Sequence, residues 1–316
     1  MLVERAKNIN MNKKSARDCA VQVAGEMGIK VASSAYIGGG SFGRVCRITS
    51  AGGEKFAVKF IAADDMLIKE THDLELLARH CPVTMPQVIA VRPPDGRVPV
   101  GCYVMKYIEG KSALMSLKLL LKSREKRLDF AAQVTQALHA IHSCKSRMFG
   151  DTLSPDCADW LSYYKPFAAQ VMQKAEDMHA SGQLSDKIIR AMRAAWEGFD
   201  QIFSGGFGEA CLIHGDLNIA NIMVDERGNL CGFIDPLKSM YADREYDLFQ
   251  FDNLTGKRFE LRQTYMRQYG ASPKCDARCA FYGLWNEVYC YIKSGVLVGL
   301  IINPLIDNMY KRLAEL

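Results

Sequence analysis

The most constraining feature of this sequence is the segment His214-Gly215-Asp216-Leu217-Asn218-Ile219-Ala220-Asn221, which follows an apolar run. Asp216 and Asn221 lie five residues apart on a predicted loop, and a second acid, Asp235, follows in Ile234-Asp235-Pro236. A carboxylate on such a loop can accept a proton from a hydroxyl, while an amide and a second carboxylate supply the oxygen ligands that Mg²⁺ prefers. The spacing therefore predicts a catalytic carboxylate at Asp216 that accepts a proton. It also predicts a magnesium site at Asn221 and Asp235 beside it, as phosphoryl transfer requires.

Between these two metal-ligand candidates the sequence predicts a β-hairpin, with strands at 222–224 and 230–234 and a polar turn. A hairpin would present both ligands at one edge, because a rigid element loses less order on binding than a loop does. Asp225 is interpreted as a turn residue only.

A second motif lies far upstream, in Gly38-Gly39-Gly40-Ser41-Phe42-Gly43-Arg44-Val45, and a lysine follows it in Ala57-Val58-Lys59. The glycines fit the pattern of a loop that covers nucleotide phosphates, with which a strand lysine then pairs. Three glycines alone also suit an ordinary turn, and a lone strand lysine can simply reach solvent. The order of loop, lysine, acid, asparagine and second acid makes coincidence a poor explanation. The candidate ATP-binding residues are therefore Gly38, Gly40, Ser41, Phe42, Gly43, Val45 and Lys59.

On these motifs the chain resembles the kinase-like small-molecule phosphotransferases, the superfamily of aminoglycoside phosphotransferases, choline kinases and fructosamine (ketosamine) kinases. The H-G-D-L-N-x-x-N segment and the I-D-P that replaces the protein-kinase D-F-G carry the resemblance, which covers nearly the whole chain. Asp235-Pro236 and residues 241–248 are most similar to the ketosamine kinase branch.

The resemblance implies an α+β, bilobal, protein-kinase-like fold. Its small N-terminal lobe, at 1–106, would hold a leading helix, the Gly-rich loop, an antiparallel sheet and one crossing helix at 64–80. The larger C-terminal lobe, at 107–316, would be mainly helical and hold the catalytic loop, the metal site and an acceptor pocket. Glu70 on the crossing helix falls where the family has the acid that pairs with the strand lysine, whereas Glu75 would face outward.

The adenine site would lie in the inter-lobe hinge, at the end of a strand predicted at 101–108. Purine recognition there would use backbone N–H and C=O groups around Lys106 and Ile108, so the side chains carry little information. Asp247 resembles the family acid that accepts N–H bonds from the catalytic loop, and His214 is interpreted as a packed scaffold residue rather than an acid or base.

Two features separate this chain from protein kinases. About seventy residues lie between a predicted helix at 127–143 and His214, where protein kinases have only a few. The resemblance implies that this insertion, with two predicted helices at 157–203, helps build a pocket for a small acceptor. Gly215 replaces the arginine that pairs with activation-loop phosphate, so we expect no switching by loop phosphorylation.

The acceptor is predicted from acids and aromatic residues outside the ATP half. Carboxylates beside tryptophan suit a cationic amine, and the resemblance favours an amine-bearing sugar or alcohol. Uncharged sugars and nucleosides stay open, and solvated acids with core indoles are an equally good interpretation. The candidates are Asp156, Asp159, Trp160, Asp243, Trp285 and Glu287.

Bulk composition excludes several other classes. The net charge of +5, from 40 Lys plus Arg against 35 Asp plus Glu, comes without a long basic run, so we expect no nucleic-acid partner. The eleven cysteines lack paired spacing, which favours reduced thiols and a cytoplasmic location. Residues 1–14 lack an apolar signal region and 295–306 is too short to cross a bilayer, so we expect no membrane association. No obligate protein partner is evident.

The sequence thus predicts an ATP- and Mg²⁺-dependent enzyme that transfers the γ-phosphoryl group to a hydroxyl of a small molecule. Two alternatives remain open. The near-complete Gly-rich loop also suits an atypical protein kinase, which the long insertion opposes. A catalytically inactive nucleotide-binding module is opposed by the presence of every required polar group. The choice between ATP and GTP is not fixed by these patterns.

Overall fold

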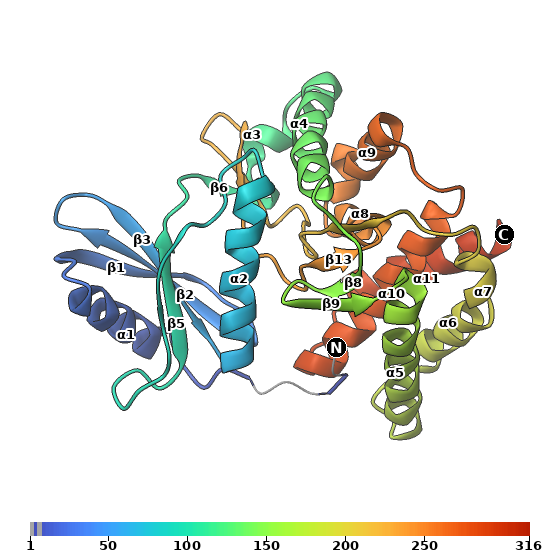
Figure 1. The fold of residues 1–316 in the computed structure, drawn as a ribbon, viewed down its shortest axis with the longest axis horizontal. Coiled ribbons are helices and arrows are strands. Elements are labelled where there is room, and N and C mark those ends of the chain that lie inside the picture. The colour runs from blue at the N-terminus through green and yellow to red at the C-terminus, as the bar shows by residue number, and fades with distance from the viewer. Residues whose placement is uncertain (1–2, 5–7) are drawn as a thin grey trace.

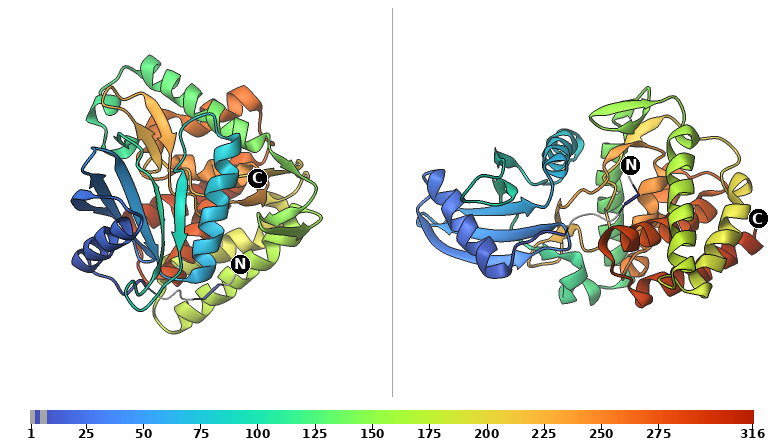
Figure 2. Two further views of the ribbon diagram at one scale, coloured as in Figure 1. Left: turned by 60° about the vertical axis from the view of Figure 1, so that its left-hand side comes forward. Right: turned by 90° about the horizontal axis from the view of Figure 1, so that it is seen from below.

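In the computed structural model, residues 3–4 and 8–316 are described, so part of the 1–14 segment lies outside the described residues. Figure 1 shows an N-terminal sheet on one side of the molecule and a mainly helical part on the other, with α2 (Asp64–His80) between them. The right panel of Figure 2 shows the same two parts side by side, seen from below. The predicted fold class, a small antiparallel sheet followed by a larger helical part, is confirmed.

The N-terminal sheet has five antiparallel strands in the order β1-β2-β3-β5-β4. Helix α1 (Lys13–Glu26) packs on this sheet, where Ala16 and Ala20 join the buried side chains of β2 and β3. Asn12 caps the helix, because its Oδ1 accepts a hydrogen bond from the Ser15 N–H at 2.9 Å. The strands are β1 (Val31–Gly38), β2 (Gly43–Ser50), β3 (Lys55–Ile61), β4 (Val88–Arg92) and β5 (Gly101–Lys106).

Helix α2 belongs to the core of the helical part as well as to the sheet. Its Leu67, Leu74 and Leu77 are buried in the large hydrophobic cluster that also contains α4 and α10 side chains. The predicted span of 64–80 matches the observed helix. Helix α2 packs against both parts. The side chains on the face of α2 that lies between them are therefore held in a fixed position.

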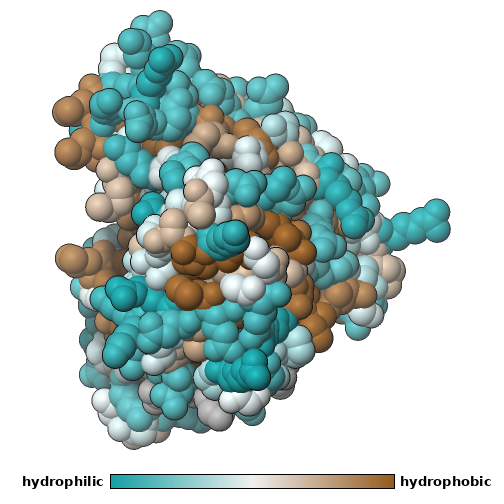
Figure 3. All heavy atoms as spheres, turned by 90° about the vertical axis from the view of Figure 1, so that its left-hand side faces the viewer, coloured by the Kyte–Doolittle hydropathy of each residue, from teal (hydrophilic) through white to brown (hydrophobic). Residues whose placement is uncertain are grey.

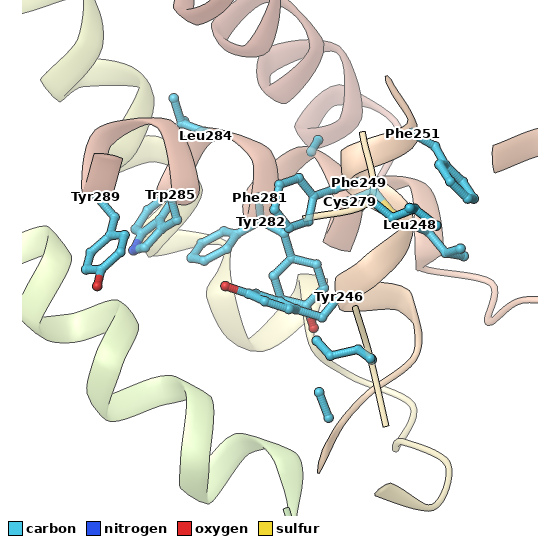
Figure 4. Close-up of a cluster of buried hydrophobic side chains, with 14 of the residues drawn as sticks. Tyr246, Leu248, Phe249, Phe251, Cys279, Phe281, Tyr282, Leu284, Trp285 and Tyr289 are labelled. Atoms are coloured by element: carbon cyan, nitrogen blue, oxygen red, sulfur yellow. The ribbon is translucent and has the colours of Figure 1, made fainter. Parts of the chain in front are cut away.

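The helical part surrounds a buried aromatic cluster, shown in Figure 4 on α8, the following 3₁₀ turn and α10. Trp285 stacks on Phe281 with ring centroids 3.8 Å apart. Tyr246 and Tyr282 meet edge to face at 4.9 Å, a geometry that the ring quadrupoles favour. The longer helices are α4 (Arg124–His142), α5 (Trp160–Ala180), α6 (Asp186–Glu197), α10 (Cys275–Ser294) and α11 (Gly299–Ala314); the shorter ones are α3 (Leu117–Leu120), α7 (Phe199–Ile202), α8 (Glu245–Leu248) and α9 (Leu261–Tyr269).

Two small sheets lie within the helical part. The predicted hairpin is β11 (Ile222–Val224) and β12 (Leu230–Phe233), and β6 (Lys111–Ser112) pairs with β11 to make a third strand. The other sheet, in the order β7-β10-β13-β8-β9, was not predicted, because strands of two to four residues give no usable alternation. Its strands are β7 (Lys145–Ser146), β8 (Phe149–Asp151), β9 (Ser154–Cys157), β10 (Ala210–Leu212) and β13 (Met240–Ala242).

The surface of the sheet-bearing end is mixed: Figure 3 shows apolar patches broken by polar side chains. Within residues 3–4 and 8–316, no helix has the length and apolar character needed to cross a membrane. The insertion at 157–203 forms the two predicted helices, α5 and α6, and in addition the short α7.

Candidate active site

The loop that carries Asp216 is fixed by a buried carboxylate. Asp247 accepts hydrogen bonds from the backbone N–H groups of His214 and Gly215, each at 2.9 Å, and from His142 Nε2 at 3.2 Å. Burial raises the pKa of Asp247, but the hydrogen bonds from His142 and from the His214 N–H help to bring this pKa below its ordinary value. Asp247 therefore stays ionised and holds the loop in one geometry.

Gly215 is required by the chain that crosses it. Its φ is +81°, and a Cβ added there would lie 2.3 Å from the Leu237 carbonyl oxygen and 2.6 Å from that of Lys238. The backbone after Asp235 thus passes directly over the catalytic loop. Asp235 and Lys238 both have φ near +60°, a conformation that costs a non-glycine residue free energy and clusters at functional sites. The sequence pattern explained Gly215 only as the replacement of an arginine. The structure shows that Gly215 also has a steric role.

Asp216 and Asn221 face each other across this loop. The Nδ2 of Asn221 donates to the backbone oxygen of Asp216 at 2.8 Å and to its Oδ2 at 3.0 Å. Asn218 Nδ2 donates to Asp216 Oδ1 at 3.0 Å. With its nitrogen turned to Asp216, Asn221 keeps its Oδ1 for a further ligand. Burial, followed by the charge of Asp235, raises the pKa of Asp216 to about 7, a value suited to exchanging a proton near neutrality.

Lys59, Glu70 and Asp235 form one charged group between the two parts of the molecule. The Lys59 ammonium pairs with a carboxylate oxygen of each acid. The Tyr103 hydroxyl donates to Glu70 Oε1 at 2.8 Å, so the carboxylate is oriented from two sides. Tyr103 was not predicted, since an aromatic residue in a strand carries no signal beyond packing. Asn221 lies next to this group, because its carbonyl oxygen accepts the Ile234 N–H at 3.0 Å.

Helix α2, which carries Glu70, is tied to the helical part by a second lysine. Lys69 Nζ donates to Asp73 Oδ2 at 2.5 Å, to Thr152 Oγ1 at 2.8 Å and to the Ser239 carbonyl oxygen at 2.8 Å. These bonds join α2 to the β8–β9 turn and to the chain just after Lys238. This link was not predicted, because Thr152 and Ser239 are far from Lys69 in the chain.

A cavity of about 300 Å³, here called the Lys59 cavity, opens beside these charges. Ile37, Val45 and Ala57 line it from the N-terminal sheet, and Met223 and Ile234 line it from the hairpin. Apolar walls that end at a lysine and a carboxylate suit a flat, apolar ring that carries a charged tail. The cavity also includes Lys59, Asp235, Lys106 and Ile108.

Among residues 106–108, which connect the two parts, one backbone N–H has no acceptor within the described residues. The N–H groups of Lys106 and Tyr107 already donate to the carbonyl oxygens of Gln87 and Lys55, at 3.0 and 3.2 Å. The Ile108 N–H donates to none of the described residues. Of the groups predicted to bind a purine, Ile108 N–H is therefore the donor that remains.

The Gly-rich turn between β1 and β2 depends on a glycine that was not among the candidates. Gly39 has φ +145°, and a Cβ there would lie 2.4 Å from the Gly43 carbonyl oxygen, whereas Gly38 and Gly40 have open space around them. Gly38, Gly40, Ser41 and Gly43 lie in or beside this turn, and Val45 and Lys59 line the Lys59 cavity. Phe42 lies in the same turn but lines a second cavity.

The second cavity, of about 520 Å³ and here called the Lys238 cavity, has walls from both parts of the molecule. Phe42 and α2 residues line it on one side, and Tyr163, Tyr289 and Lys238 line it on the other. The charge of Lys238 lowers the pKa of Asp216, as the charge of Asp235 raises it, so the Asp216 carboxylate is close to both cavities.

The six predicted acceptor contacts do not line the Lys238 cavity. Trp160 and Trp285 are fully buried, and their Nε1 groups donate to Tyr282 Oη at 2.8 Å and to the Ala168 carbonyl oxygen at 2.9 Å. Both indoles are core residues, as Figure 4 shows for Trp285. Asp159 caps α5 by accepting the Ser162 N–H at 2.9 Å, Asp243 is buried, and Asp156 and Glu287 also lie outside the cavity. Asp159 and Trp160 line another cavity, so the six acceptor contacts stay a prediction; of the aromatic cluster on α5, Tyr163 is the residue that lines the Lys238 cavity.

With this geometry in view, the class of the protein follows from comparison with known families. The model of the phosphotransferase enzyme (APH) family matches residues 35–282, most of the chain. The chain therefore belongs to this phosphotransferase family, and the resemblance inferred from its motifs is confirmed. No curated protein sequence gives a significant match.

Solved structures share the fold at low sequence identity. A Thermobifida fusca protein assigned as a fructosamine-3-kinase is 20% identical with a TM-score of 0.66, covering 94% of this chain and 99% of its own. The GDP complex of aminoglycoside 2'-phosphotransferase-IIIa is 14% identical with a TM-score of 0.69, covering 96% and 99%. A ternary complex of aminoglycoside phosphotransferase APH(4)-Ia with AMP-PNP and hygromycin B is 16% identical with a TM-score of 0.62, covering 93% and 95%. At these identities the likeness shows the fold alone.

Proposed function

We propose that this phosphotransferase moves the γ-phosphoryl group of ATP to a hydroxyl of a small molecule, with Asp216 as the catalytic base. One observation supports this most strongly. Lys59 pairs with both Glu70 and Asp235, and the charge of Asp235 acts on Asp216, so candidate residues that are far apart in the sequence gather in one place. The solved relatives with bound AMP-PNP, GDP or ADP support a nucleotide as the donor.

In the proposed reaction, the nucleotide base lies in the Lys59 cavity and the Ile108 N–H binds it. Lys59, oriented by Glu70, binds the phosphates, and the backbone of 38–43 covers them. The acceptor hydroxyl attacks the γ-phosphorus in line, its proton passes to the Asp216 carboxylate, and the bond to the bridging oxygen breaks to release ADP. Asn218 and Asn221 keep that carboxylate aimed at the hydroxyl.

The donor set beside Asp216 fits a magnesium ion. Asn221 Oδ1 and the Asp235 carboxylate are hard oxygen donors, and Mg²⁺ in such enzymes binds one or two protein groups together with phosphate oxygens and water. When bound, the ion would neutralise charge on the phosphate oxygens. Asp235 pairs with Lys59 in this structure, so both side chains would exchange this contact for phosphate or metal as the nucleotide binds.

The acceptor is expected to enter the Lys238 cavity, whose volume of about 520 Å³ suits a small molecule. Hygromycin B and gentamicin are the acceptors named in two related structures. The amine-bearing acceptor predicted from the resemblance and from six residues stays a prediction, although those residues do not line this cavity.

A direct test measures ADP release, with product masses, from ATP and from GTP in the presence of Mg²⁺ and pooled sugars, amines, hydroxy acids and a generic protein. We expect acceptor-dependent ADP release that is lost in Asp216→Asn, and a product heavier by one phosphoryl group. Tight nucleotide binding with phosphorylation of the protein pool alone would reject the small-molecule assignment. Absence of nucleotide binding would reject the enzyme assignment.

A further inference from the structure

The Lys238 cavity has an unusual charge arrangement for a site that would take an amine. Five charged side chains line it: Asp65, Lys69, Asp151, Lys238 and Lys293. Asp65 is exposed near the start of α2, and Lys69 is neutralised by Asp73 and, at 3.6 Å, by Asp151. Lys69 can neutralise only one of these acids, so this wall keeps a net negative charge. Among the described lining residues, the charges on the opposite wall are only Lys238 and Lys293, and these two lysines decide which charge binds there.

Neither of these two lysines has a carboxylate partner among the described residues. Lys238 Nζ donates to the amide oxygen of Asn286 at 2.6 Å and lies 4.0 Å from the centre of the Tyr289 ring. Lys293 Nζ lies 5.9 Å from the same ring. Asp216 acts on Lys238 from beyond ion-pair distance, and no described ion pair involves Lys293. Two ammonium groups thus share one aromatic face.

This pair is electrostatically unfavourable without a ligand. Burial lowers the pKa of Lys238, and the charge of Lys293 lowers it further. A bound anion would relieve the repulsion, because charge-assisted hydrogen bonds to a carboxylate or phosphate stabilise both ammonium groups. A polycationic acceptor would instead add like charge, which is how proteins reject wrong ligands.

The rest of the cavity is apolar and aromatic. Tyr163 and Tyr289 present rings, and Leu153 and Leu237 are 51% and 42% exposed, which is high for large apolar side chains beside a cavity. A ligand with a flat or apolar body would cover these groups and gain hydrophobic stabilisation. Phe42, at the tip of the Gly-rich turn, lines the same space, so the donor and acceptor sites share a wall.

We infer, resting on the proposed function, that the acceptor is a hydroxyl compound with an apolar or aromatic body and an anionic group, and that Lys238 and Lys293 bind that group. The two lysines are specificity-determining residues. The acceptor's hydroxyl lies at the other end of the cavity, where Asp216 accepts its proton. An aminoglycoside-like polycation is disfavoured at this site.

A matched set of three ligands tests the charge directly: 4-(hydroxymethyl)benzoate, 4-(hydroxymethyl)benzamide and 4-(hydroxymethyl)benzylamine. They share one aromatic alcohol and differ in carrying a negative, a neutral or a positive group. Calorimetric titration into the full chain with Mg²⁺ and AMP-PNP should rank the carboxylate first, by about ten-fold over the amide, the effect of one charge-assisted hydrogen bond. Equal or tighter binding of the amine, or no binding of the carboxylate, overturns the inference.

Variants identify the residues and separate this inference from the proposed function. Lys293→Met and Lys238→Met should each remove the preference for the carboxylate and leave AMP-PNP binding unchanged. Lys165→Met, which changes a lysine paired with Asp200 outside the cavity, should leave the preference intact. Weaker AMP-PNP binding in the two cavity variants would show that the lysines serve the nucleotide phosphates, and would overturn the inference while supporting a kinase. Absence of AMP-PNP binding by the unmodified chain would instead reject the proposed function.

Discussion

The two cavities near Asp216 differ in how their residues are spread along the chain. The Lys59 cavity draws on a glycine turn, a strand lysine, a connecting segment and a hairpin, each of which has a recognisable sequence pattern. The Lys238 cavity draws residues from six separate segments, and of these only Phe42 belongs to a motif. If the proposed function holds, the half that binds the phosphates is tied to motifs, while the half that selects the acceptor can change without disturbing the fold.

The largest expected effect removes the Asp216 carboxylate, on which charges from both cavities act. Asp216→Asn should lower the rate of phosphoryl transfer by about 10²–10⁴-fold, because the hydroxyl loses its proton acceptor. Nucleotide and acceptor should still bind, since neither cavity loses a lining residue. Turnover and calorimetric binding, measured in parallel, check this. Asp156→Asn, an exposed acid outside both cavities, is the matched control and should change neither.

A smaller effect should separate the two cavities. Lys59→Met should lower turnover by about 10²–10³-fold and weaken nucleotide binding, because a preorganised charge on the phosphates is lost. Acceptor binding should stay unchanged. Lys55→Met, on the same strand but paired at the surface with Glu109, serves as the control. Equal weakening of both ligands by Lys59→Met would contradict the division into two cavities.

Residues 237 and 238 cross over Gly215 between the two cavities. One added methyl group at Gly215 should disrupt this crossing. Gly215→Ala should reduce the free energy of unfolding by about 2–4 kcal/mol, since its Cβ would meet the Leu237 and Lys238 carbonyls at a φ that favours glycine. Gly208→Ala, at an exposed glycine with open space around it, should be close to neutral. Chemical denaturation of both variants gives the comparison. Equal stability would remove the steric role assigned to Gly215.

The smallest expected effect concerns the scaffold beneath both cavities. Burial lowers the pKa of His142 and of His214 below 6.5, so both are neutral in the folded protein near neutral pH. The unfolded chain binds protons at these sites below about pH 6.5 and the folded chain does not, so the contribution of these two histidines to the free energy of unfolding should fall by about 1 kcal/mol as pH drops toward 5. Asp216, whose pKa is raised to about 7, contributes in the opposite direction over this range, so the effect is measured as the difference between the unmodified chain and a histidine variant.

Denaturation midpoints across this pH range test the assignment. His142→Gln should lower stability at neutral pH, because Asp247 and Tyr265 lose a partner, and should make the remaining decline with acid shallower. His80→Gln, at an exposed position, should leave the slope unchanged. A slope that is steeper in His142→Gln would contradict the neutral state of this histidine.

Sequence patterns predicted the elements that regular periodicity or a motif defines. The helix at 64–80 was predicted to the residue, because its leucine stripe and the acids of its first turn mark both its face and its start. The hairpin between Asn221 and Asp235 was predicted from two short apolar runs around a polar turn. The pairing of Lys59 with Glu70 was predicted from the resemblance, and the structure places the two side chains in contact.

What the sequence could not predict depends on contacts between distant segments. Tyr103 orients Glu70 and Lys69 ties α2 to Thr152, but a strand tyrosine and a helix lysine look ordinary in one dimension. The residues of the Lys238 cavity were not predicted for the same reason. Trp160 and Trp285 were candidates because of nearby acids, yet their helical spacing turns both indoles into the core. Lys238 and Lys293 share a cavity only because α10 returns to the segment after Asp235.

The central claim is that Asp216 lies where a nucleotide's γ-phosphate meets an acceptor hydroxyl. A crystal structure with AMP-PNP and Mg²⁺ tests it most directly. The account predicts the purine against Ile108 N–H, the cation on Asn221 and Asp235, Lys59 turned from Asp235 to the phosphates, and the γ-phosphate facing Asp216 and the Lys238 cavity. A nucleotide bound outside the Lys59 cavity, or a γ-phosphate pointing away from Asp216, would contradict it.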